Sequence, residues 1–160
     1  MDINISLSTT DIVAWWGAII ATTVLVWDVF KWITSGAKIR LLVSSNMQMF
    51  GGFEQDDKNY ITLRVTNVGD RPTTISTIGG KHYKNLWSKL TNKVNQAFVI
   101  PNPALNNQQL PYVLDVGQEW MGGADQTEEI ERMAKDGYLI MEVYDAVHKN
   151  PTKGRVIIND

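Results

Sequence analysis

The chain of 160 residues is 44% hydrophobic and 20% charged, with 12 Gly, 5 Pro and no Cys. Its length suits one folded domain, and this composition excludes a collagen, a disordered tail and a disulfide scaffold. The lack of Cys and the presence of only two His exclude a thiol enzyme and nearly exclude a zinc enzyme. The formal net charge of −2 gives no overall preference for nucleic acid. We therefore expect no duplex nucleic acid as a partner and no cofactor.

A long apolar segment occupies residues 12–33, and residues 12–27 carry no charge. As a helix with a rise of 1.5 Å per residue, the segment spans roughly 33 Å, against about 30 Å for the hydrocarbon core of a bilayer. Four Trp lie near its two ends, as in the aromatic belts of membrane helices: Trp15, Trp16, Trp27 and Trp32. This pattern predicts one transmembrane helix; the alternatives are a buried helix and an interfacial anchor.

The residues that flank this segment predict where the helix begins and how it is oriented. Ser8 and Asp11 have the spacing of a capping box. Residues 1–11 lack the basic region of a secretory signal peptide, so we expect the helix to be retained. The nearby basic residues all lie on the C-terminal side, namely Lys31, Lys38 and Arg40. The positive-inside rule then places the N-terminus outside the inner (cytoplasmic) membrane and residues 37–160 in the cytoplasm.

One face of the predicted helix, within residues 1–36, combines small residues with a carboxylate. At 100° per residue, this face holds Ala14, Gly17, Ala18, Ala21, Leu25 and Asp28. Small residues allow membrane helices to approach closely, so the face predicts packing into a homo-oligomer. Asp28 would then lie on the packed face and could line a water path. Alternatively, Asp28 lies at headgroup depth and pairs with Lys31.

Residues 37–160 show mainly the alternating pattern of strands. Residues 60–66, for example, alternate Ile61, Leu63 and Val65 with polar side chains. The pattern predicts six or seven short strands: an entering strand and turn at 38–43 and 47–53, followed by strands at 60–66, 73–78, 97–100, 112–116, 138–144 and 155–158. A helix is expected at 127–135, capped by Thr127 or Asp125, and a second helical stretch at Leu86, Leu90 and Val94.

Residues 60–78 form a predicted strand, the turn Asn67-Val68-Gly69-Asp70-Arg71-Pro72 and a second strand, and they are followed by Leu114-Asp115-Val116-Gly117-Gln118 and the predicted hairpin at 138–158. This combination resembles the small β-sandwich domains of bacterial membrane-anchored proteins. The resemblance implies a fold class: an N-terminal transmembrane α-helix followed by a mainly β, sandwich-like domain with one or two short helices. It implies no activity.

The sequence holds none of the common catalytic or nucleotide-binding motifs. The chain is therefore expected to be non-enzymatic. Acidic residues that could converge as calcium ligands are Asp56, Asp57, Asp70 and Asp145, but scattered acids at turns are the ordinary interpretation.

Charge is segregated along residues 37–160. Residues 71–114 contain no Asp or Glu, whereas residues 115–145 contain nine acids. This asymmetry predicts either head-to-tail contacts between subunits or an anion site in the basic half. The predicted ligand contacts are Arg71, Lys81, His82, Tyr83, Lys84 and Asn85, where Gly79 and Gly80 permit close backbone approach. The alternative is a solvated hairpin whose lysines lie near anionic lipid.

Trp87 and Trp120 are expected in the core or an interface.

One membrane helix joined to a small cytoplasmic β domain resembles, in layout and length, the small membrane effectors of bacterial antiviral systems, including those of type III CRISPR immunity. The resemblance implies a domain that binds a cyclic oligonucleotide, such as cyclic oligoadenylate, and an oligomeric helix bundle that perturbs the membrane. The alternative function is a membrane-anchored structural or adaptor subunit that binds a protein partner.

Overall fold

In the computed structural model, the described residues are 8–49, 58–103, 105 and 108–158. The chain divides into two compact units, residues 1–35 and 36–160. The first unit contains the helix α1 (Thr9–Thr34), which begins at the predicted capping box. Ser8 Oγ accepts a hydrogen bond from the Asp11 amide, and Asp11 Oδ2 accepts one from the Ser8 amide at 3.0 Å. The predicted start of the helix is confirmed.

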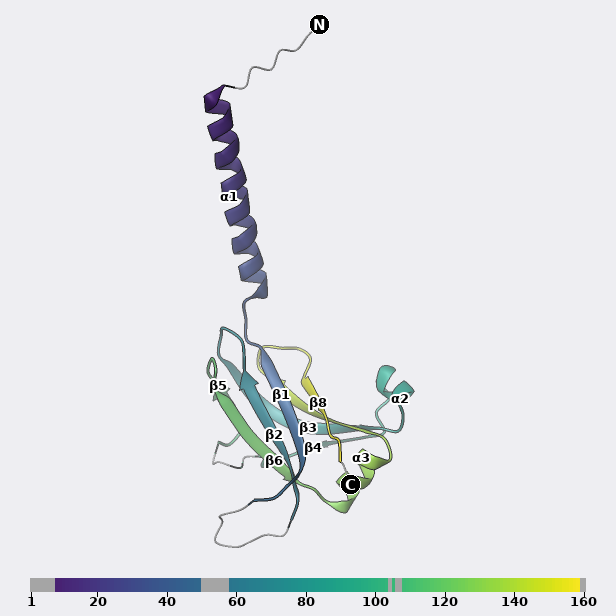
Figure 1. The fold of residues 1–160 in the computed structure, drawn as a ribbon. Helices are drawn as coiled ribbons and strands as arrows, with labels where there is room; N and C mark the ends of the chain where they lie inside the picture. The colour runs from purple at the N-terminus through teal and green to yellow at the C-terminus, as the bar shows by residue number, and fades with distance from the viewer. Residues whose placement is uncertain (1–7, 50–57, 104, 106–107, 159–160) are drawn as a thin grey trace. The chain divides into compact units, whose positions relative to one another are not determined.

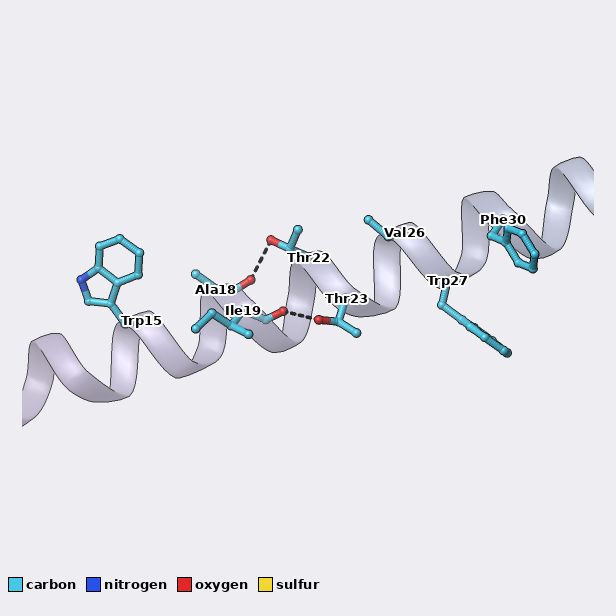
Figure 2. Close-up of a pocket in the computed structure, with 8 residues that line it drawn as sticks. All are labelled: Trp15, Ala18, Ile19, Thr22, Thr23, Val26, Trp27 and Phe30. Carbon is cyan, nitrogen blue, oxygen red and sulfur yellow. Dashed lines mark hydrogen bonds between the residues drawn. The ribbon is translucent and has the colours of Figure 1, made fainter.

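The helix α1 is long and apolar enough to cross a membrane. Fourteen of its large apolar side chains are exposed, by 46% to 75%. Figure 2 shows the side chains along an open groove on one side of α1: Trp15, Ala18, Ile19, Thr22, Thr23, Val26, Trp27 and Phe30. The hydroxyls of Thr22 and Thr23 each donate to a backbone carbonyl one turn earlier, at 2.8 Å. Both polar groups are therefore satisfied within the helix, as a lipid environment requires.

The second unit contains two antiparallel sheets, labelled in Figure 1. The first sheet has the order β1 (Ile39–Met47), β2 (Tyr60–Asn67), β6 (Glu119–Asp125). The second has the order β4 (Gln96–Val99), β3 (Thr73–Tyr83), β7 (Tyr138–Asp145), β8 (Thr152–Arg155), and β5 (Tyr112–Leu114) also pairs with β3. An apolar helix followed by a sandwich-like β domain is the predicted fold class, which is confirmed.

The core lies between the inner faces of the two sheets. Ile61, Leu63 and Val65 are fully buried, as their alternation predicts, and Trp120 of β6 is fully buried as well. The cluster is completed by residues of the second sheet and by Val156, which follows β8; the sheet residues are Ile75, Ile78, Leu114, Leu139, Met141 and Val143.

Several predicted strand limits are wrong. The described residues form eight strands, of which β6, with Gly122 and Gly123 in its sequence, was not predicted. The strand β3 continues through Gly79 and Gly80 to Tyr83 instead of ending before them. The predicted strand 112–116 ends at residue 114, and the strand predicted at 155–158 lies at 152–155. The entering strand and turn predicted at 38–43 and 47–53 form one longer strand, β1, which ends at Met47, and residues 50–53 lie outside the described residues.

Two short helices complete the domain. The helix α3 (Glu128–Lys135) is capped by Thr127, as predicted. The helix α2 (Leu86–Leu90) is capped by Asn85 and ends before Val94. Trp87 on α2 is 75% exposed and lies outside the core, so of its two expected locations an interface stays a prediction.

The turn between β2 and β3 is held by the buried side chain of Asn67. Its Nδ2 donates to the carbonyls of Arg71 at 2.8 Å and Leu114 at 3.1 Å, and its Oδ1 accepts from the Gly69 amide at 3.0 Å. Asp70 Oδ1 accepts from the Gly36 amide at 2.6 Å, which fixes the point where the chain enters the domain. The turn motif seen in the sequence is therefore structural.

Replacing Asn67 by alanine is expected to lower the free energy of unfolding by about 2 kcal/mol, because buried carbonyls and an amide lose their partner. Urea denaturation of the full chain in detergent, followed by circular dichroism, measures the change. Asn150→Ala, at an exposed turn, is the control and should unfold like the wild type. Equal loss in both variants would contradict this role of Asn67.

Candidate anion-binding site

Most charged side chains of the candidate site lie on the outer face of the second sheet. Because strand side chains alternate, Lys81 of β3, Glu142 and Tyr144 of β7, and Lys153 and Arg155 of β8 point away from the core. The residues between them face inward. A Cβ at Gly80 would meet the Phe98 ring, and one at Gly154 would meet Val43 and Leu41.

A buried carboxylate lies at the centre of this face. Glu142 is only 1% exposed, and its Oε2 contacts Lys81 Nζ at 2.9 Å and the Tyr144 hydroxyl at 2.7 Å. Lys153 Nζ lies 3.6 Å from the other oxygen, Oε1, which is buried and has no hydrogen-bond partner among the described residues. Glu142 therefore ties two lysines of different strands to β7.

The charges of this cluster stabilise one another. Burial by itself raises the pKa of Glu142, but hydrogen bonds from Lys81 and Tyr144 and the nearby lysine charges outweigh burial, so its pKa lies below the ordinary value. The hydrogen bond to Glu142 raises the pKa of Lys81 above its ordinary value, and partial desolvation opposes this shift. Glu142 is therefore ionised at neutral pH and neutralises one lysine charge of the face.

Acidification is expected to remove the stability that Glu142 contributes. A carboxyl group whose pKa is lower in the folded state stabilises the fold above its unfolded pKa of about 4.5, and this stability is lost as pH falls through the folded pKa. Urea denaturation of the full chain at pH 7 and at pH 3 to 4 measures the loss. The wild type should lose more stability over this interval than Glu142→Gln, and identical pH dependences of the two proteins would contradict the assignment.

Beside this cluster is a concave depression of about 190 Å³ that we call the basic depression. It is lined by Tyr83, Lys89, Ile140, Lys153, Gly154 and Arg155. The Tyr138 ring makes cation–π contacts with two of these side chains. Arg155 Cζ lies 4.5 Å and Lys89 Nζ 5.4 Å from the ring centroid. No ion pair with a carboxylate is found for these two within the part of the chain that the structure describes. Cations arranged in this way suit a phosphate or another oxyanion.

Only part of the predicted ligand set lies near the basic depression. Lys81 is on the same face but is paired with Glu142. Tyr83 is 3% exposed and forms part of the lining, while its hydroxyl donates to Asn92 Oδ1 at 3.0 Å. Tyr83 therefore cannot offer an open ring face to a base.

The other predicted contacts lie elsewhere. His82 faces the opposite side of β3, is 7% exposed and lies 3.3 Å from the Asn95 amide. Asn85 caps α2 by accepting from the Ser88 amide at 2.8 Å. Lys84 is exposed at the end of β3, and Arg71 precedes the other end of this 11-residue strand, roughly 36 Å away at 3.3 Å per residue. The structure therefore does not bring Arg71 together with residues 81–85.

Lys89, Lys153 and Arg155 are site residues that were not predicted from the sequence. The signal for the last two is their spacing, because residues two apart on a strand share a face. Lys89 joins them only because α2 follows β3, the strand beside β7.

The predicted packing face of α1 is a second candidate site. Ala14, Gly17, Ala18, Ala21 and Asp28 are all exposed, and a Cβ at Gly17 would meet nothing within 4 Å. Helix–helix packing through this face stays a prediction.

A metal site is not supported within the described residues, which contain no group of three potential metal-ligating side chains. Asp70 bonds to the Gly36 amide, and Asp145 lies 2.9 Å from His148 Nδ1. Asp56 and Asp57 lie outside the described residues.

Comparison with known proteins gave no relative: no protein-family model, curated protein or solved structure matches this chain.

Proposed function

We propose that this protein is a non-enzymatic membrane effector whose β domain binds a phosphate-bearing anion in the basic depression. The supporting observation is that Lys89, Lys153 and Arg155 line one concave site, while Glu142, the carboxylate beside Lys153, is already shared with Lys81. A phosphate group bound there would gain charge-assisted hydrogen bonds from three cations.

The helix α1 anchors the domain in this proposal. Its exposed apolar side chains would be unfavourable in water over the whole length of the helix, and lipid or neighbouring helices would cover them. The basic residues after the helix orient the domain toward the cytoplasm. Ligand binding would shift an oligomer, packed through Ala14, Gly17, Ala18, Ala21 and Asp28, between two arrangements of its helices.

The test uses the full chain in lipid nanodiscs. Thermal unfolding is followed in the presence of cyclic di-, tri- and tetraadenylate, with pyrophosphate as a simpler probe of phosphate chemistry. We expect at least one of these probes to raise the unfolding temperature, and the rise should shrink with added salt. No rise with any of them would contradict the proposed ligand class.

An adaptor function is the second candidate, and the edge of the second sheet favours it. The strands β4 and β5 both lie at this edge, where Val99 is 64% and Val113 58% exposed. Among the described strands, β4 and β5 pair only with β3, and such an edge with exposed valines can accept a strand of a partner protein. Replacing α1 by an unrelated membrane helix separates the two functions: an adaptor would keep its activity, and an effector that works through α1 would lose it.

A further inference from the structure

We infer that α2 is a second membrane contact, which inserts into the surface of an anionic bilayer. This inference rests on the proposed anchoring by α1. The contact consists of Leu86, Trp87 and Leu90, which we call the α2 tip. These side chains are 51%, 75% and 69% exposed, although α2 is only five residues long.

The composition around the α2 tip favours lipid over a protein partner. Three exposed lysines, Lys84, Lys89 and Lys93, flank the tip, and residues 71–114 contain no Asp or Glu. Trp and Leu side chains enter the interfacial region of a bilayer, and lysines beside them attract anionic headgroups. An acidic protein surface could pair with the lysines. To bury Trp87, which is 75% exposed, that surface would also need a pocket that fits the indole.

Anchoring by α1 keeps the β domain close to the bilayer, so even a weak contact of the α2 tip with lipid is effective. Only Ser35 and residues 36–38 separate the end of α1 from β1, so a membrane-anchored domain stays within reach of the bilayer. The strand β3 has 11 residues, and α2 follows it directly, whereas the chain enters the domain near the start of β3. Contact of the α2 tip with the same bilayer therefore requires β3 to run along the membrane surface.

The lack of Cys allows a site-specific test in the full chain. Leu86→Cys carries an environment-sensitive fluorophore, and the protein is reconstituted into vesicles of phosphatidylcholine with or without phosphatidylglycerol that contain brominated lipid as quencher. Ile157→Cys, which is 59% exposed outside the tip, is the matched control site. We expect blue-shifted, lipid-quenched emission from position 86 in the anionic vesicles, weaker quenching in neutral vesicles, and neither effect at position 157.

A second variant tests whether the tip itself inserts. Trp87→Ser with Leu90→Ser, combined with the label at position 86, should lose the blue shift and the quenching while the circular dichroism spectrum is unchanged. Membrane binding itself is checked by flotation of the protein with the vesicles in a density gradient. Unquenched emission from position 86 in protein that floats with the vesicles would overturn this inference and leave the anchoring by α1 intact. A blue shift that depends on protein density and not on the quencher would also overturn it, in favour of contact with a second copy. Protein that fails to float would overturn the anchor and this inference together.

Discussion

The Trp120→Ala variant is expected to lose about 3–5 kcal/mol of unfolding free energy, a large fraction of the roughly 5–15 kcal/mol that is typical of a folded domain. The indole is fully buried between the sheets, and its Nε1 donates to the Gln108 carbonyl at 2.8 Å. A Cβ at Gly122 would collide with the ring, so the glycine makes room for it. Truncation would leave both a cavity and an unpaired carbonyl.

Trp87→Ala is the matched control, because it removes the same side chain from a position that is 75% exposed. Its unfolding free energy should stay within about 0.5 kcal/mol of the wild type. Urea denaturation of the full chain in detergent, monitored by circular dichroism, compares the two variants. If both lost the same stability, Trp120 would not be the centre of the core.

Removing two cations of the basic depression should abolish most ligand affinity. In the double variant Lys153→Ala, Arg155→Ala, each lost charge-assisted contact is worth about 1.5 kcal/mol, so the dissociation constant should rise roughly a hundredfold. The variant should stay folded, because Glu142 keeps its contacts with Lys81 and Tyr144. Calorimetric titration with the most stabilising probe gives the dissociation constant.

The matched control removes the same charge elsewhere. Arg132→Ala with Lys149→Ala takes two cations from exposed positions on α3 and in the turn before β8. This control should bind within about threefold of the wild type, because only long-range attraction is lost and salt screens it. Equal loss of affinity in the two double variants would mean that net charge, and not the basic depression, determines binding.

Local patterns were sufficient to predict much of the fold. The start of α1 follows from Ser8 and Asp11, and the strand β2 follows from the alternation of Ile61, Leu63 and Val65. The cap of α3 at Thr127 is equally local. Each of these features depends on residues that are close in sequence, so it can be predicted without knowledge of the tertiary contacts.

Glycines caused the main errors. Gly79 and Gly80 were interpreted as a break, whereas close packing against Phe98 requires them within β3. Continuing the strand places Lys81 and Tyr83 on one face and His82 on the other, which a loop interpretation hides. Similarly, Gly122 leaves space for the Trp120 ring within β6, a strand that was not predicted. The packing partner of a glycine cannot be seen in the local sequence.

The basic depression could not be predicted because its parts are distant in sequence. Lys89 lies on α2, whereas Lys153 and Arg155 belong to β8, and the pairing of β7 with both β3 and β8 brings them together. The local basic cluster at residues 81–84 was the stronger signal in sequence. Folding divides that cluster between an ion pair, two buried rings and one exposed lysine.

The central claim is that α1 crosses the membrane and that residues 36–160 face the cytoplasm. Two single-cysteine variants of this cysteine-free chain test it: Thr9→Cys at the start of α1, and Val147→Cys, which is 59% exposed in the β domain. Intact bacterial cells are treated with a membrane-impermeant maleimide. We predict that Thr9→Cys reacts at once and that Val147→Cys reacts only after permeabilisation. Reaction of Val147→Cys in intact cells, or recovery of the protein in the soluble fraction, would contradict the account.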